Sequence, residues 1–277
     1  MTRLLPIPIT DDHIHIDPVN GRGLEAAKDF KRAGGTHLFL VSKPSWSFGI
    51  TPGKGEDFIP VFEGTLSIAR QIRELGIMVF PVLGVHPAEI TRLAGIMGLS
   101  RAEQVMLEGL DVAAGFVNRG EAVALKSGRP HYEVTDEVLE ASNRILRRAL
   151  LLAGECRCAV QLHAEGGPCS DVVEMAREVG LPVEMVVKHF ATPDTPLVPS
   201  LIARHEAIPA LAATGRPFMM ESDYMDENSR PGSVIGPKSV PRFTRRLLET
   251  GELSEEAAHR IHVETPSRTY GVEIQPP

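Results

Sequence analysis

The chain has 277 residues, of which 43% are hydrophobic and 23% charged, and its formal net charge is −7. This composition is that of an ordinary globular protein, and the length suits one large α/β barrel, so we expect a single domain over 1–277. The acidic balance argues against binding along a phosphate backbone and favours a small or end-on ligand.

No charged-then-apolar leader follows Met1, and no apolar span is long enough to cross a bilayer, so no membrane partner is expected. The three cysteines are too few for a disulfide framework, and the Cys156-Arg157-Cys158 spacing is neither a zinc hairpin nor a redox pair. We interpret them as structural and expect a cytoplasmic protein. The sequence does not predict the oligomeric state.

Apolar runs alternate with helical stretches along the chain. Strands are predicted at 4–9, 38–41, 77–83, 122–125, 159–162, 183–187, 197–203 (the weakest) and from 218. Helices are predicted at 24–33, 61–75, 88–117 with a break at 98–100, 136–154 capped by Thr135, 170–179, 240–248 and 254–262. Sequential strands joined by helices favour a TIM (β/α)8 barrel. An open doubly wound sheet is disfavoured, because no glycine-rich phosphate turn follows the first strand.

His13 and His15 follow the first apolar run and are separated by one residue. Because strand side chains alternate between faces, both imidazoles point the same way and can hold one metal ion. Later apolar runs also end in polar residues: Lys126, His163, His189 and Asp223. The carboxyl ends of barrel strands converge on one mouth, and strand parity places these side chains together there. Such a set suits zinc first, with manganese, iron, cobalt or nickel as alternatives.

Six motifs together resemble one family and occur in that family's order. They are Asp12-His13-Ile14-His15, Gly84-Val85-His86-Pro87, Gly128-Arg129-Pro130-His131-Tyr132, Leu162-His163-Ala164-Glu165, Lys188-His189 and Glu221-Ser222-Asp223. Through them the chain resembles the archaeal branch of the TatD-like metal-dependent hydrolases, in the amidohydrolase superfamily. The resemblance implies a barrel, one or two divalent metal ions and hydrolysis by metal-activated water. Many relatives cleave phosphodiesters, some as deoxyribonucleases.

One position departs from the family pattern. The family is expected to place a bridging glutamate at the end of the fourth strand, where this chain has Lys126. Glu121 cannot replace it, because it has the wrong parity and lies at the opposite end of the strand. Nearby cations would lower the pKa of the Lys126 amine. Three outcomes stay open: a carbamate on Lys126 bridges two metals, as in phosphotriesterase-like relatives; the second metal is lost and Lys126 holds substrate; or the site is vacant.

The expected roles follow from this chemistry. One metal would be held by His13, His15 and Asp223, and the other by His163 and His189, with Lys126 as the carbamate between them. Asp223 is the candidate general base for the attacking water. His86 and Arg129 are candidates for polarising a phosphoryl or carbonyl oxygen. Substrate contacts are expected from Lys43, His131, Glu165 and Arg230, with a rim salt bridge as the alternative role of Glu165.

The expected function is hydrolysis of a phosphoester in a small molecule or at a nucleic-acid end. One alternative is hydrolysis of a lactone, amide or phosphotriester with a carboxylated Lys126. An alternative of another class is a catalytically silent barrel that binds metal or ligand. Trp46 is expected to cap the barrel mouth. Four histidines without a strand-end context receive no role: His37, His205, His259 and His262.

Overall fold

In the computed structural model, which describes residues 7–229 and 234–276, strand β1 runs from Thr10 to His15 and contains both histidines of the first motif. The chain divides by its internal contacts into two units. Unit 1 holds residues 1–40, 68–80 and 199–277, and unit 2 holds residues 41–67 and 81–198. Each unit has its own hydrophobic core. This division does not test the single domain over 1–277, which stays a prediction.

Unit 1 is built on parallel strands. They are β1, β2 (His37–Val41), β7 (Val198–Ile202), β8 (Met219–Glu221) and β9 (Tyr224–Met225), with the first part of β3 (Met78–Gly84). Strand β1 pairs with β2 and β9, and β7 pairs with β8. The end of β8 returns beside β1, because the Ser222 N–H donates to Asp11 Oδ1 and the Asp223 N–H donates to the His13 carbonyl, both at 2.9 Å.

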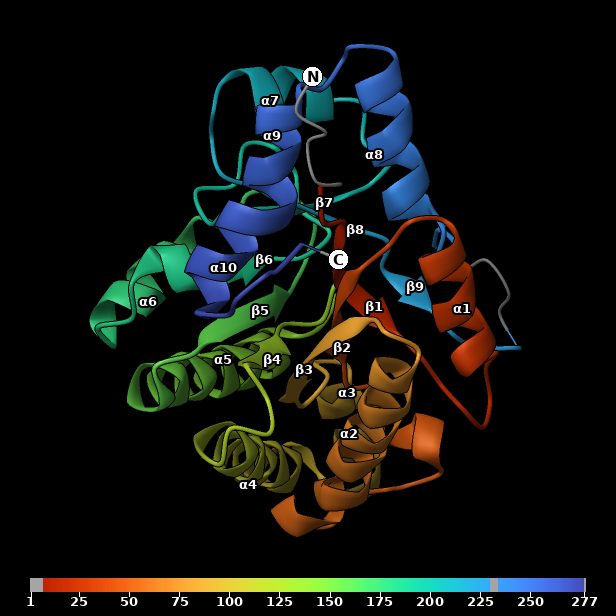
Figure 1. Ribbon diagram of the computed structural model, residues 1–277. Helices are drawn as coiled ribbons and strands as arrows, with labels where there is room; N and C mark the ends of the chain where they lie inside the picture. The colour runs from red at the N-terminus through yellow and green to blue at the C-terminus, as the bar shows by residue number, and fades with distance from the viewer. Residues whose placement is uncertain (1–6, 230–233, 277) are drawn as a thin grey trace. The chain divides into compact units, whose positions relative to one another are not determined.

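The helices of unit 1 are α1 (Leu24–Arg32), α7 (Ile208–Ala213), α8 (Ser239–Glu249), α9 (Glu255–His259) and α10 (Thr265–Tyr270), with the end of α2 (Ile59–Glu74). Helix α1 forms because its apolar residues recur on one face, and that face covers β1 and β2 (Figure 1). Phe30, Ile14 and Leu38 are fully buried in the resulting core.

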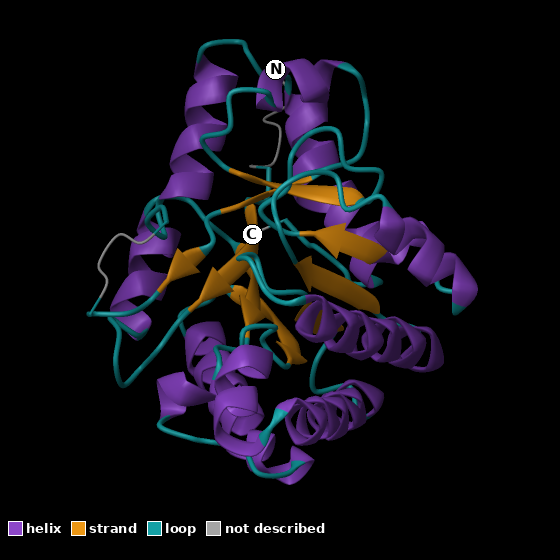
Figure 2. Ribbon diagram, turned by 180° about the vertical axis from the view of Figure 1, so that it is seen from behind, coloured by secondary structure: helices purple, strands orange, loops and turns teal. Residues whose placement is uncertain are grey.

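In unit 2 the strands follow the parallel order β3-β4-β5-β6, with β4 (Ala124–Gly128), β5 (Ala159–His163) and β6 (Val186–Lys188) (Figure 1). Figure 2 draws the strands in orange and the helices in purple. Its helices are α3 (Glu89–Met97), α4 (Leu99–Asn118), α5 (Asp136–Cys156), α6 (Asp171–Glu178) and the start of α2, with 3-10 turns at Ser45–Phe48, Gly55–Phe58 and Val183–Met185. Helices α4 and α5 lie side by side over the strands (Figure 1).

Glycine is required where the strand ends of unit 2 approach one another. Gly128 ends β4 with a φ of 151°, and a Cβ there would lie 1.6 Å from the His163 carbonyl oxygen. A Cβ on Gly84, at the end of β3, would lie 1.9 Å from the Lys126 oxygen. Both glycines therefore permit the close strand pairing that brings Lys126 and His163 to one edge of the sheet.

Parallel strands that alternate with helices, and the return of β8 beside β1, confirm the predicted α/β fold of TIM-barrel type. Most predicted elements are observed with small shifts at their ends, including the weak strand that became β7. Among the described residues, no helix combines the length and the apolar character that a bilayer crossing requires.

Some local predictions are wrong. The predicted strand at 4–9 lies partly outside the described residues, and β1 starts only at Thr10. The first half of the predicted strand at 183–187 is a 3-10 turn, in which the Met185 N–H donates to the Pro182 carbonyl at 2.9 Å. Thr135 occupies the N-cap position of α5, but its side chain makes no capping hydrogen bond. Helices α7 and α10 and strand β9 were not predicted.

The predicted helix at 254–262 ends early for an identifiable reason. After His259 the chain continues as a π-helical turn over Arg260–Glu264. Pro266 has no N–H to donate to the His262 carbonyl, four residues before it. That carbonyl instead accepts a hydrogen bond of 2.6 Å from the Thr10 hydroxyl. The irregular turn thus connects the last helices to the start of β1.

Candidate functional site

In unit 1, His13, His15 and Asp223 lie together where β1 meets the end of β8. The two Nε2 atoms of His13 and His15 are 3.1 Å apart, and both rings are buried. The Asp223 Oδ1 atom lies 3.9 Å from His13 Nε2. Asp223 has a φ of 44°, in the left-handed region, which Asp tolerates better than most residues. The three side chains predicted to hold one metal ion are therefore neighbours.

Strand β1 carries two further buried carboxyl groups, those of Asp11 and Asp12. The Asp11 carboxylate accepts the backbone N–H of His13 at 3.3 Å and of Ser222 at 2.9 Å, and so connects the two strands that carry the cluster. Burial raises the pKa of Asp11 to about 8, against the opposing effect of its hydrogen bonds to Ser222. Burial also raises the pKa of Asp12 to about 8, and the negative charge of Glu221 adds to this effect.

In unit 2, three histidines form a hydrogen-bonded row along the strand ends. His131 Nδ1 lies 2.9 Å from His163 Nε2, and His163 Nδ1 lies 2.8 Å from His189 Nε2. A neutral imidazole has one N–H and one lone pair, so His163 can donate to one neighbour and accept from the other. We call His131, His163 and His189 the histidine row.

His86 and Lys126 lie close to the histidine row. The His86 and His163 ring centroids are 4.7 Å apart, and the Lys126 side chain is buried. Burial holds the pKa values of His86 and His163 well below the ordinary value for histidine. The positive charges of Lys126 and of neighbouring histidines lower both pKa values further. The imidazoles of His86 and His163 are therefore neutral at pH 7, the form in which histidine binds metal.

Both histidine pairs have the spacing of metal ligands. Nitrogens that bind one ion at 2.0–2.1 Å lie about 2.8–3.4 Å from each other, depending on the coordination angle. The His13–His15 distance of 3.1 Å and the His163–His189 distance of 2.8 Å fall in this range. The donor set of unit 1, two imidazoles and a carboxylate, suits a divalent transition metal. The residues present therefore fit such an ion.

The Arg129 guanidinium is fully engaged by neighbouring side chains. Its Nε donates to Glu165 at 3.1 Å, and Nη2 donates to the other oxygen of the same carboxylate. Its Nη1 donates to Asp171 at 2.5 Å and to Asn143 at 3.3 Å. The predicted rim salt bridge of Glu165 is confirmed. Polarisation of a substrate by Arg129 stays a prediction, and it would require one of these contacts to open.

The remaining predicted residues occupy separate positions. Lys43 is 4% exposed and follows β2. The Trp46 ring packs edge-on to His86 with centroids 6.0 Å apart, and the Arg92 guanidinium lies over it. Arg230 lies outside the described residues. The roles predicted for these residues are not tested by their positions.

Asp226 is a buried carboxylate that the sequence analysis missed. It accepts the backbone N–H groups of Asp17, Arg22 and Gly23 at 2.7–3.0 Å and the Tyr224 hydroxyl at 2.8 Å. It therefore fixes residues 17–23, the loop that directly follows β1, the strand in which His13 and His15 lie. No local sequence signal identifies it, because its partners in the loop lie about 200 positions away in the chain.

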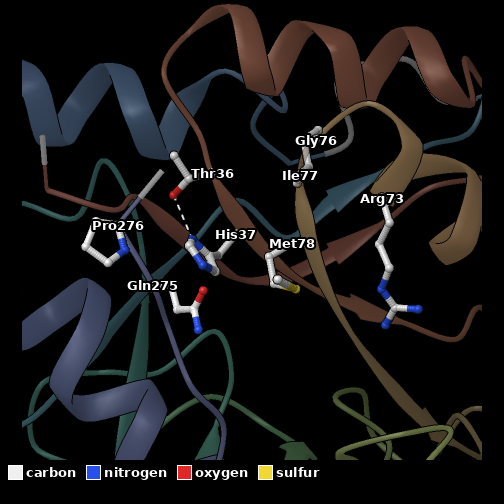
Figure 3. A pocket seen from close by; sticks show the side chains of 8 residues that line it. All are labelled: Thr36, His37, Arg73, Gly76, Ile77, Met78, Gln275 and Pro276. Atoms are coloured by element: carbon white, nitrogen blue, oxygen red, sulfur yellow. Dashed lines mark hydrogen bonds between the residues drawn. The ribbon is translucent and has the colours of Figure 1, made fainter.

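Unit 1 also contains a cavity of about 320 Å³ at the amino-terminal ends of β2 and β3 (Figure 3). It is lined by Thr36, His37, Arg73, Gly76, Ile77, Met78, Gln275 and Pro276. His37 Nδ1 lies 2.8 Å from the Thr36 hydroxyl, as Figure 3 shows. Among the described residues that line it there is one imidazole and no carboxylate, so these residues do not make up a metal-binding set.

Comparisons with known proteins identify the family of this chain. A family model described as TatD related DNase matches residues 10–271. An uncharacterized protein of Methanocaldococcus jannaschii is 36% identical over 287 residues, which cover 99% of this chain and 100% of that protein.

Two solved structures show the same fold. A lactonase from Listeria monocytogenes has a TM-score of 0.63 at 15% identity, covering 95% of this chain and 94% of that one. The phosphotriesterase homology protein from Escherichia coli, complexed with phosphate, has a TM-score of 0.61 at 14% identity, covering 96% and 99%. The family match decides the classification: this chain belongs to the family described as TatD related DNase and is a metal-dependent hydrolase.

Proposed function

We propose that this hydrolase cleaves phosphoesters with the help of one or two divalent metal ions, zinc first. The observation that supports this is the ligand-like spacing of two pairs of buried imidazoles, His13 with His15 and His163 with His189. In this proposal His13, His15 and Asp223 hold one ion, and His163 and His189 hold another. A bound ion supplies Lewis acidity and a water that loses its proton near neutral pH.

Asp223 is the proposed general base. Its backbone is fixed because its N–H donates to the His13 carbonyl at 2.9 Å, and its side chain is only 15% exposed. A fixed carboxylate beside the metal ligands can accept the proton of the attacking water without reorganisation.

His86 is the proposed donor to the substrate oxygen. Its Nδ1 accepts the Ala88 N–H at 3.2 Å, so the neutral ring carries its proton on Nε2. That N–H is then available to donate a hydrogen bond to a phosphoryl oxygen as negative charge develops on it. The neutral ring can fill this role, and burial favours the neutral form.

Lys126 is the residue that distinguishes the two candidate functions, hydrolysis of a phosphoester and hydrolysis of a lactone, amide or phosphotriester. Its side chain is 1% exposed, and its charge lowers the pKa values of His86 and His163. Burial penalises the charged form of this side chain, which favours the neutral amine. That amine can add carbon dioxide and release a proton, giving a carbamate that supplies the carboxylate His163 and His189 otherwise lack. The second candidate function, hydrolysis of a lactone, amide or phosphotriester, rests on this lysine.

Metal analysis and a substrate panel test the proposal. The panel contains 4-nitrophenyl phosphate, bis(4-nitrophenyl) phosphate, a nitrophenyl phosphotriester, a lactone and single-stranded DNA. We expect bound divalent metal and turnover of a phosphoester, and we expect Asp223→Asn to abolish turnover while the circular dichroism spectrum is retained. Turnover of only the lactone or the triester supports the second function. A metal-loaded protein with no turnover contradicts both and supports a silent binding barrel.

The carbamate is tested separately. Protein incubated with ¹³C-bicarbonate should show a carbamate carbon signal that Lys126→Ala lacks. Lys126→Glu should keep the metal content that Lys126→Ala loses, because glutamate restores a carboxylate. A wild-type spectrum without that signal, at full metal content, contradicts the carbamate. A cytoplasmic location and a small-molecule or nucleic-acid-end substrate remain predictions from the sequence.

A further inference from the structure

Two exposed aromatic residues stand at the two ends of the histidine row. Tyr132 follows His131, and Phe190 follows His189. The His131 and Tyr132 ring centroids are 5.3 Å apart with an interplanar angle of 82°. The His189 and Phe190 centroids are 6.4 Å apart at 74°. Each terminal imidazole therefore has an aromatic ring set edge-on beside it.

Both rings are unusually open to solvent. Phe190 is 53% exposed and Tyr132 is 40% exposed. Burying a phenylalanine side chain ordinarily stabilises a fold, so a ring left this open is available for contact with a ligand. Phe48, which is 37% exposed, is a third exposed ring in the described part of the chain, and it lies in the 3-10 turn Ser45–Phe48.

The open position of Phe190 is held by the fold. Its φ is 49°, in the left-handed region, where a bulky residue is a genuine outlier. The buried Lys188 ammonium donates to the His189 carbonyl at 3.0 Å and to the Ala164 carbonyl at 3.4 Å. The first of these contacts fixes the peptide group that joins His189 to Phe190. The strained backbone and its buried support together present the ring outward.

Tyr132 is held by a different contact. Its hydroxyl lies 2.6 Å from the Thr91 hydroxyl on helix α3. A hydrogen bond at the far end of the ring limits its rotation. Both aromatic residues are therefore positioned before a ligand arrives, which reduces the entropy lost on binding.

We propose that Tyr132 and Phe190 are two ring-binding positions of the substrate subsite, one at each end of the histidine row, a proposal that rests on the proposed phosphoesterase function. Either position takes a flat aromatic group carried on the ester, a nucleobase or a simple aryl ring. Stacking against an exposed aromatic face is tolerant of ring identity, because every such ring has a π-face. The histidine row between the two residues would then face the phosphoryl group of the same ester.

Three diesters with one leaving group test this subsite. They are the methyl, phenyl and thymidine-5′ esters of S-trifluoroethyl phosphorothioate, so the departing thiol is the same in each, carries no ring, and only the second group differs. The measured quantity is the ratio of kcat/KM for a ring-bearing ester to that for the methyl ester. We expect Phe190→Ala to lower this ratio about tenfold, the size of one lost stacking contact. Tyr132→Ala should lower it as well, and Phe48→Ala should leave it unchanged.

The phenyl and thymidine esters distinguish a subsite for an aryl ring from a subsite for a nucleobase. A fall for the thymidine ester alone identifies a nucleobase subsite, and a fall for both ring-bearing esters identifies a general aryl subsite. An unchanged ratio in both Phe190→Ala and Tyr132→Ala overturns the proposal, because their effects are then structural. If the wild type hydrolyses none of the esters, the proposed function fails. Calorimetric binding of diphenyl and dimethyl phosphate to wild type and Phe190→Ala then decides the subsite by the same comparison.

Discussion

His262 is a buried imidazole that makes the stability of unit 1 depend on pH. The side chain is fully buried, its Nδ1 lies 3.1–3.2 Å from the backbone N and O of Thr10, and its Nε2 lies 2.9 Å from the Thr244 hydroxyl. Burial lowers the pKa of His262 to about 4, although the Thr10 backbone opposes this shift. The folded protein therefore keeps this ring neutral at pH values where the unfolded chain protonates it.

The sign and size of the effect follow from this difference. Above a pH of about 6.5 the ring is neutral in both states and its contribution to stability is complete. As the pH falls from about 6.5 to 4, the unfolded chain takes up a proton that the folded chain does not, and the free energy of unfolding falls. A pKa difference of roughly 2.5 units corresponds to a loss of about 3 kcal/mol.

Equilibrium unfolding in urea between pH 7 and 4.5 measures this term. His262→Gln removes the titrating group, so the stability advantage of the wild type over this variant should shrink by about 2–3 kcal/mol across the range. Thr244→Val is the matched control: it removes the hydroxyl partner of Nε2 and keeps the imidazole, so it should cost about 1–3 kcal/mol and retain the pH slope. A wild-type advantage over His262→Gln that is constant with pH would refute the reasoning.

Four further outcomes are expected. Gly128→Ala should destabilise the protein by about 3 kcal/mol or more in urea unfolding, because its Cβ would overlap the neighbouring strand at a φ of 151°. Gly154→Ala in α5, where a Cβ has open space, should instead stabilise by about 0.5–1 kcal/mol. Asp226→Asn should cost about 2 kcal/mol and speed amide hydrogen exchange in residues 17–23, whereas unchanged exchange would contradict its role. In a variant whose other two cysteines, Cys156 and Cys169, are replaced by serine, Cys158 should resist a thiol reagent at pH 8 until urea is added. The reason is that burial raises the pKa of the Cys158 thiol to about 12.

The candidate site was largely predictable because its signals are local. A buried strand has a side-chain period of two, and polar residues at the ends of apolar runs are conspicuous against that pattern. His163 and His189 were found in this way, and the structure places them 2.8 Å apart. His131 was predicted only as a substrate contact, and its place in the histidine row was not expected. The row needs the β4–β5 approach that Gly128 permits, which no local periodicity encodes.

The supports of the site were not predictable, because each one joins distant parts of the chain. Asp226 and the loop it fixes are separated by 203–209 positions, and Thr10 and His262 by 252. From the sequence alone an aspartate is expected at the surface, because burying an unpaired carboxylate costs too much free energy. Only the folded chain shows that backbone N–H groups satisfy it. The sequence could therefore predict candidate residues for hydrolysis, but not residues such as Asp226 and His262 that stabilise the surrounding backbone.

A comparison of His262, which received no role from the sequence, with the candidate ligand His163 shows why residue type alone does not identify chemistry. His262 and His163 both lose their charge to burial, yet their partners differ. His262 meets the Thr10 backbone and the Thr244 hydroxyl, which can satisfy a neutral ring completely. His163 meets two other imidazoles, and such a row gains a stronger common partner when a cation replaces the shared protons. In our proposal the same desolvation thus stabilises the fold at His262 and prepares a metal ligand at His163, and the neighbouring groups account for the difference.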